Sequence, residues 1–321
     1  MDNPTALLKL QERFCLSKIG GEIRVIDREN SFEYYKKIDG DLLLKRYLEA
    51  LDIAHNPKDV IKNFWINGNT LMYDTVAFSP LEKPKTTLNY WVGPVVQPSK
   101  QDCSQILDFL YEVICDGDQQ SFDYLCSFIS HCLIKPEEKP GICIVLIGGQ
   151  GTGKGVFFQL MRSIWKYTTL LINDMESITG RFNSSLERNF IICLDEALFV
   201  GDKKSRDRLK SMITEPTITI EQKFQPTRTI SSYHRFFAAT NHDHFTHVER
   251  DDRRFLFLRL GDSHKQDTSY FAELVGSFSD GKTLSGFVNY LLNDPTELDI
   301  RTKPRTKEHV DQKIKSLEGF G

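Results

Sequence analysis

The sequence predicts an α/β fold in which a central parallel sheet is flanked by helices, and two observations support this prediction. First, three apolar segments have the length of strands and are separated by helical stretches: 142-ICIVLIG-148, 190-FIICLDE-196 and 235-RFFAATN-241. Continuous apolar strands are typical of a parallel sheet that is buried on both faces. Second, the earliest of these segments leads through a glycine-rich turn directly into 155-GVFFQLMRSIW-165, whose apolar residues recur at helical spacing.

Composition describes an ordinary soluble protein. The 321 residues are enough for about two domains. The net charge is −3, so any nucleic-acid contact is expected to be a local patch. The seven cysteines are odd in number and form no Cys-x-x-Cys pair, which favours reduced structural thiols over disulfides or a zinc site. With no signal-peptide core and no apolar run near the roughly 18 residues of a membrane span, we expect a cytoplasmic protein without membrane association.

The organisation of the chain changes near its first third. Residues 22–26 have the pattern of a strand and 39–52 that of a helix, whereas 79–100 carries four prolines and is the best boundary. Two amphipathic helices are expected over 102–114 and 120–134. We therefore divide the chain into a small α+β N-terminal accessory domain (1–98), a helical segment packed on the sheet domain (99–136), the sheet domain (137–293) and a basic C-terminal tail (294–321).

The glycine-rich turn 148-GGQGTGKG-155 matches G-x-x-x-x-G-K, and its place between a strand and a helix is that of a phosphate-binding loop. Backbone N–H groups and the helix N-terminus would close around phosphate oxygens, and Lys154 would reach the β and γ phosphates. The plainer alternative is a glycine-rich turn with a surface lysine. The residues expected to bind the nucleotide are Gly148, Gly149, Gln150, Gly151, Thr152, Gly153, Lys154 and Gly155.

Gly155 stands where such loops usually carry the serine or threonine that touches Mg²⁺. Mg²⁺ keeps several waters and needs few protein ligands, so a carboxylate elsewhere can complete its shell. Asp195 and Glu196 end an apolar strand, where adjacent acids are costly unless they meet a cation or water. We expect Asp195 to hold Mg²⁺, directly or through water, and Glu196 to polarise the attacking water; the alternative is a helix N-cap pair.

Two further polar groups follow in the sequence. Thr240 and Asn241 end the next strand and could orient water beside the γ phosphate, although asparagine often simply ends a strand in a turn. Arg253 and Arg254 precede another apolar strand. An arginine that contacts the γ phosphate bound by a neighbouring subunit can accelerate nucleotide hydrolysis by a factor of about 10³ to 10⁵. The alternative is a salt-bridged turn with the preceding aspartates.

The order of these parts resembles the superfamily 3 helicase ATPases, and most closely the helicase half of phage and plasmid primase-helicase (prim-pol) replication proteins. The resemblance covers nearly the whole chain. Its main carriers are 148-GGQGTGKG-155, 194-LDEA-197, 217-TITIEQKF-224, 240-TNHDHF-245 and 252-DRRF-255, with weaker ones at 14–25, 78–80 and 88–93.

The resemblance implies an AAA+ ATPase that uses ATP and Mg²⁺, forms a homo-oligomeric ring, expected to be a hexamer, and moves along single-stranded DNA. It implies that Asn241 senses the γ phosphate and that Arg253 or Arg254 is the finger supplied to a neighbour. A primase-polymerase domain, which this sequence lacks, is expected on the same polypeptide. Related proteins continue past the point that corresponds to 311-DQKIKSLEGFG-321, so the sequence is expected to be a fragment. Glu215-Pro216 departs from the wider superfamily and is given no role.

A β-hairpin is expected over 217-TITIEQKF-224 and 229-TISSYHRFF-237, joined by a turn. In the superfamily 3 helicases, which this sequence resembles, such a hairpin enters the channel of the ring, and Lys223 falls at the position that contacts DNA. One lysine per subunit would give a ring of positive charge after assembly. The alternative is an edge-strand lysine that blocks aggregation. The basic helix over 203–210 could also touch DNA or be a solvated surface, and its candidate residues are Lys203, Lys204 and Arg208.

These observations favour an ATP-driven DNA helicase or translocase of phage or plasmid replication. The alternative is a non-hydrolysing, nucleotide-gated ring that binds DNA and recruits or stabilises a primase-polymerase. Gly155 favours the alternative, whereas Glu196, Asn241 and the two arginines favour the motor.

Overall fold

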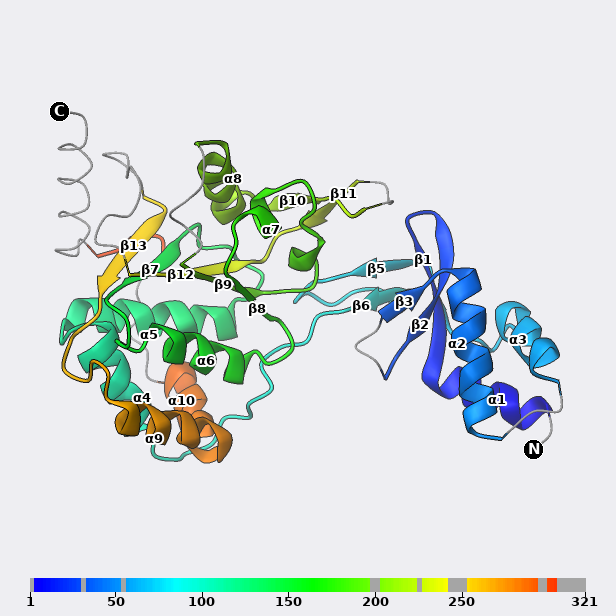
Figure 1. Ribbon diagram of the computed structural model, residues 1–321, viewed down its shortest axis with the longest axis horizontal. Coiled ribbons are helices and arrows are strands. Elements are labelled where there is room, and N and C mark those ends of the chain that lie inside the picture. The colour runs from blue at the N-terminus through cyan, green and yellow to red at the C-terminus, as the bar shows by residue number, and fades with distance from the viewer. Residues whose placement is uncertain are drawn as a thin grey trace. The chain divides into compact units, whose positions relative to one another are not determined.

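The computed structural model describes residues 3–29, 33–52, 56–196, 203–223, 227–241, 253–293 and 299–304 (Figure 1). The chain divides into two compact units, Met1–Trp91 and Val92–Gly321. The division falls within the proline-containing stretch, slightly before the boundary expected at residue 98. Of the expected C-terminal tail, only residues 299–304 are described.

The first unit is a four-stranded sheet with helices. The strand order is β3-β2-β1-β4, in which β1 and β2 form a hairpin closed by Gly20 and Gly21. Both glycines have positive φ, as a two-residue hairpin turn requires. Successive residues of β1 face opposite sides: Phe14 packs with helical residues such as Leu44, and Cys15 packs with Leu88. The elements are α1 (Asn3–Arg13), β1 (Phe14–Ile19), β2 (Glu22–Asp27), β3 (Glu33–Tyr35), α2 (Lys37–Ala50), α3 (Pro57–Ile66), β4 (Met72–Tyr73), β5 (Thr75–Ala77) and β6 (Thr87–Asn89).

The second unit is built on a five-stranded, wholly parallel sheet of order β13-β7-β12-β9-β8. Its strands are β7 (Cys143–Ile147), β8 (Thr169–Ile172), β9 (Ile191–Asp195), β12 (Arg235–Thr240) and β13 (Phe255–Arg259). All residues of β7 and β12 are buried. The parallel sheet and its three predicted apolar strands are confirmed.

Helices cover both faces of this sheet (Figure 1). Phe237 of β12 packs against Phe128 and Phe157 from helices on one face. Its neighbours Phe236 and Ala238 point to the other face, into the core formed with α7, α8 and β10. The first face carries α4 (Ser104–Asp108), a π-helix (Phe109–Ile114), α5 (Gln119–Ile134), α6 (Lys154–Ile164), α9 (Thr268–Ser279) and α10 (Lys282–Asn293), and the second face carries α7 (Glu176–Thr179), a 3₁₀ turn (Ser184–Leu186), α8 (Lys203–Thr214), β10 (Thr217–Ile220) and β11 (Arg228–Ser231).

The expected hairpin is present as antiparallel β10 and β11, but both arms are shorter than predicted. The first arm ends at Ile220 and not at residue 224. The second arm, predicted over 229–237, is β11. It ends at Ser231, and Arg235 already belongs to β12. The reason is that the guanidinium of Arg235 is buried and donates to the carbonyls of Lys135, Pro136 and Glu138. This anchor turns the chain away from the hairpin and into the parallel sheet.

Two further observations concern the cysteines and the character of the helices. All seven cysteines are unpaired and buried, as reduced structural thiols should be. In the described part of the chain, no helix combines the length and apolar character that a bilayer crossing needs.

Candidate functional site

The glycines of the turn after β7 have the geometry that the phosphate-loop interpretation requires. Gly151 and Gly153 have φ of +78° and +98°, which L side chains rarely adopt. A Cβ on Gly148 would lie 2.7 Å from the hydroxyl oxygen of Thr152. That hydroxyl donates to the carbonyl of Gly149 at 2.9 Å and therefore braces the loop from inside. Gln150 and Gly155 are exposed, so the rim of the loop is open to a ligand.

Lys154 begins α6 and folds its side chain back over the loop. Its ammonium donates to the carbonyls of Gly148 and Gly149 at 2.6 and 2.8 Å, and to Oδ1 of Asn241 at 2.6 Å. The residue is 8% exposed. Burial lowers the pKa of Lys154, and the nearby carboxylates of Glu196 and Asp195 oppose that shift. The loop lysine thus lies in the field of the predicted acid pair.

Strand order explains why these groups meet. β12 lies between β7 and β9, with Thr240 beside Ile147 and Ala239 beside Asp195. Because all three strands are parallel, their carboxyl ends share one edge of the sheet. Along that edge the order is therefore the loop, Asn241 and the acid pair.

Glu196 is held by two contacts to the neighbouring strand. Its N–H donates to the carbonyl of Ala239 at 3.0 Å, and its Oε2 accepts from the N–H of Asn241 at 3.3 Å. Its φ is +53°, a left-handed value that is uncommon for glutamate. Residues held in such conformations cluster at functional sites. A continuous chain of contacts thus runs from Lys154 through Asn241 to Glu196.

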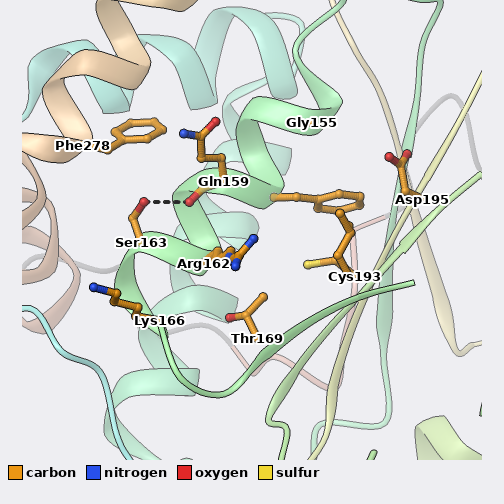
Figure 2. Close-up of a pocket in the computed structure, with 11 residues that line it drawn as sticks. Gly155, Gln159, Arg162, Ser163, Lys166, Thr169, Cys193, Asp195 and Phe278 are labelled. Carbon is orange, nitrogen blue, oxygen red and sulfur yellow. Dashed lines mark hydrogen bonds between the residues drawn. The ribbon is translucent and has the colours of Figure 1, made fainter. Parts of the chain in front are cut away.

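Asp195 and Gly155 line a cavity of about 570 Å³, within the usual range of ligand sites (Figure 2). A Cβ on Gly155 would meet no atom of the described residues within 4 Å. The absent hydroxyl therefore leaves open space beside the Asp195 carboxylate. One carboxylate next to open space suits a hydrated Mg²⁺, which binds few protein groups. Among the described residues no cluster of three or more metal-binding side chains occurs, so a site built from protein ligands alone is not found there.

Arg253 and Arg254 lie at the amino ends of the parallel strands, whereas the loop lies at their carboxyl ends. Phe255 pairs with Cys143 at the start of β7, and the N–H of Cys143 donates to the carbonyl of Arg254. The loop begins five residues further along β7, a distance of about 17 Å at roughly 3.3 Å per residue. Arg253 is exposed. The two arginines are therefore not brought to the loop of their own chain.

The candidate DNA-binding residues lie on the α8 and hairpin side. Lys223 follows β10 and is exposed, as is Lys204 on α8. Arg208 donates to the carbonyls of Thr179 and Gly180 at 2.8 and 2.9 Å, which ties α8 to the end of α7. Lys203 starts α8, but its side chain is outside the described residues.

A segment that the sequence analysis missed also contacts the loop. The N–H of Gln266 donates to the carbonyl of Gly151 at 2.9 Å, and the side chain of Lys265 lies against Gly149. No sequence motif marks these residues, because the contact arises only when the chain returns from β13. A helical spacing does connect Gly155 with Arg162, which lines the same cavity from α6, and Lys166 lines it from the turn after that helix (Figure 2). This spacing was open to detection in the sequence.

Comparisons with known proteins cover the region of the chain that contains this site. A model described as a family of unknown function (DUF5906) matches residues 146–254. This range contains the loop, the acid pair, Asn241 and the two arginines. The DNA primase-polymerase of Nitratiruptor phage NrS-1 is 26% identical over 205 residues, which cover 61% of this chain and 27% of that protein. The chain therefore spans only a minor part of that relative's length.

Solved structures give a likeness over a larger share of the chain. One apo structure of the NrS-1 C-terminal region matches with a TM-score of 0.76 at 18% identity, covering 96% of this chain and 73% of that one. Another matches with a TM-score of 0.73 at 19% identity, covering 100% and 75%. The chain is thus homologous to part of the NrS-1 primase-polymerase, and with the C-terminal region of that protein it shares a mixed α/β fold whose five-stranded parallel sheet is flanked by helices.

Proposed function

We propose that this chain binds ATP and Mg²⁺ at the 148–155 loop and hydrolyses the nucleotide to move along or unwind DNA. One observation carries the proposal: the Lys154 ammonium bonds the Asn241 side chain, and the Asn241 backbone bonds the Glu196 carboxylate. A phosphate-binding cation, a polar orienting group and a carboxylate base thereby meet at one sheet edge. This combination suits the hydrolysis of a phosphoanhydride, in which positioning and charge stabilisation supply most of the catalysis.

Each residue has a role that its position supports. Lys154 would exchange a loop carbonyl for a phosphate oxygen, and the N–H groups of the loop would hold the remaining oxygens. Glu196 would accept a hydrogen bond from the attacking water and withdraw its proton. Asn241 would orient that water beside the γ phosphate. Mg²⁺ bound beside Asp195 would neutralise charge on the β and γ phosphates.

The arginine positions support catalysis between subunits. Because Arg253 and Arg254 lie at the far edge of the sheet, they would serve the nucleotide of a neighbouring copy. A closed ring gives every loop one such neighbour. We therefore infer a homo-oligomeric ring of the AAA+ type, with six subunits as the resemblance implies.

DNA is the proposed track. The similarity to a DNA primase-polymerase supports a role in phage DNA replication in the host cytoplasm, with a primase-polymerase domain on the same polypeptide. The β10–β11 hairpin presents Lys223, and Lys204 adds positive charge on the same side of the sheet. A ring would multiply these charges, which reconciles DNA binding with a net charge of −3 per chain.

Gly155 supports a second candidate, a nucleotide-gated ring that binds DNA without hydrolysis and recruits the primase-polymerase. The position lacks the hydroxyl that usually touches Mg²⁺, and in the described part of the chain no atom lies within 4 Å of a Cβ built there. The two candidate functions differ in one property, which is whether the bound ATP is hydrolysed.

Complementation between inactive subunits tests the proposed motor. An Arg253→Ala/Arg254→Ala double variant and a Lys154→Ala variant should each be inactive in ATP hydrolysis. Mixing them should restore part of the activity, since some interfaces then pair an intact loop with intact arginines. No recovery at any ratio, with mixed assemblies verified by native mass spectrometry, would contradict catalysis across subunits.

A further inference from the structure

The segment that follows β13 returns over the phosphate loop and is held there by its backbone. Gln266 donates its N–H to the carbonyl of Gly151 at 2.9 Å, and a Cβ on Gly151 would lie 3.0 Å from Cγ of Gln266. Gln266 has φ of +63°, a left-handed value in a residue that is not glycine. Asp267 then caps α9 by accepting from the N–H of Tyr270. The start of α9 is therefore packed directly against the loop.

This segment carries a second lysine to the loop. Cε and Nζ of Lys265 lie 3.3 and 3.4 Å from the position that a Cβ on Gly149 would occupy. The ammonium is 3.3 Å from Oδ1 of Asp262. Both side chains of this pair are substantially exposed, at 41% and 70%. Lys265 thus places a cation on the solvent side of the loop.

The two lysines differ in how firmly they are held. An ammonium has three N–H donors, and Lys154 uses them on Gly148, Gly149 and Asn241. Lys154 must give up at least one of these bonds before it can bind a phosphate. Within the described residues Lys265 pairs with one carboxylate, that of Asp262, at an exposed position, and such pairs contribute little to stability. Lys265 is therefore the cation that can change partners at the lower cost.

We propose that Lys265 is a second phosphate-binding residue of the loop, which leaves Asp262 and binds the polyphosphate chain of the incoming nucleotide. The proposal rests on the proposed nucleotide-binding function of the same loop. Asp262 then acts as a competitor for the lysine in the empty site. Because Lys265 lies one residue before Gln266, its movement is coupled to the contact between the loop and the start of α9.

Calorimetric titration with a non-hydrolysable ATP analogue and Mg²⁺ tests the proposal. Lys265→Ala should weaken the affinity about fivefold to tenfold, the loss expected for one charge-assisted contact at a partly exposed site. Lys265→Arg should retain most of the affinity. Asp262→Asn should bind as well as the unaltered protein or up to about fivefold more tightly, because the competing carboxylate is gone. Lys282→Ala, at an exposed lysine at the start of α10, is the matched control and should change nothing.

The possible results distinguish a failure of the Lys265 proposal from a failure of the proposed nucleotide binding at the loop. Equal weakening by Lys265→Ala and Asp262→Asn would show that the pair only braces the segment, and would overturn the proposal. Unchanged affinity in Lys265→Ala would also overturn it, provided that Lys154→Ala still abolishes binding. If the unaltered protein binds no analogue at all, it is the nucleotide-binding function that fails.

Discussion

Replacing Asn241 by aspartate makes a sharp test of the contact between Lys154 and Asn241. The change is nearly isosteric and places a carboxylate where Oδ1 now lies, 2.6 Å from the ammonium. Coulomb's law at an effective dielectric constant near 20 gives an attraction of about 6 kcal/mol at that distance. Asn241 is exposed, so we reduce this to about 1.5–3 kcal/mol, as measured for hydrogen bonds to charged groups. The aspartate should hold Lys154 away from phosphate and weaken nucleotide binding about 10- to 150-fold.

Asn241→Ala is the matched comparison, and it should leave nucleotide binding unchanged. It removes one acceptor from Lys154 and adds no charge, so affinity for ATP should be kept while hydrolysis is lost. Calorimetric titration with a non-hydrolysable analogue measures both affinities, and circular dichroism checks the fold. Equal affinity for Asn241→Asp and the unaltered protein would refute the assignment of this contact to the nucleotide site.

Three further predictions concern the metal, the DNA and the pH dependence of stability. Gly155→Ser should fold normally, because the new side chain points into open space. It should raise the turnover of ATP less than about tenfold, because Asp195 and water already complete the coordination shell of Mg²⁺. A larger gain in steady-state turnover would show that the missing hydroxyl limits the enzyme. Lys223→Ala should keep DNA-independent ATP hydrolysis but lose its stimulation by single-stranded DNA. In a salt titration, the slope of the logarithm of the DNA-binding constant against the logarithm of salt concentration should flatten by about 0.7 per lost contact. An unchanged slope would indicate that Lys223 is only an edge-strand charge. Burial lowers the pKa of His131 and His234 to about 4 from 6.5. The free energy of unfolding, measured by denaturant titration, should therefore be highest above pH 6.5 and fall as the pH drops towards 4, because unfolding then takes up as many as about two protons. A free energy of unfolding that stays constant between pH 6.5 and 4 would contradict the burial of neutral imidazoles.

The parts of the site that the sequence predicted are those that local pattern determines. The apolar strands, the glycine spacing and the polar residues at the strand ends are all visible in short segments. The carboxyl ends of parallel strands meet at one edge, so the approach of Asp195 and Glu196 to the loop followed once a parallel sheet was predicted. The positive φ of Gly151 and Gly153 confirms the loop geometry that the spacing implied.

What the sequence could not reveal depends on long-range packing. The place of β12 between β7 and β9, which gives Lys154 its contact with Asn241, is a property of strand order and not of any segment. β8 was missed because it is short and only partly buried. The predicted helix over 102–114 changes to a π-helix at Phe109, and helical periodicity alone does not distinguish the two. Lys265 reaches the loop only through the path of the chain after β13.

Steady-state hydrolysis of ATP by the unaltered protein and by Glu196→Gln, with and without single-stranded DNA, distinguishes an ATP-driven motor from a nucleotide-gated ring. We predict Mg²⁺-dependent hydrolysis that DNA stimulates, and its loss in Glu196→Gln with ATP affinity retained, since the amide keeps the shape of the side chain but cannot withdraw a proton. The account would be contradicted if the unaltered protein bound ATP without hydrolysing it, a result that would favour the nucleotide-gated ring, or if Glu196→Gln hydrolysed ATP at the unaltered rate.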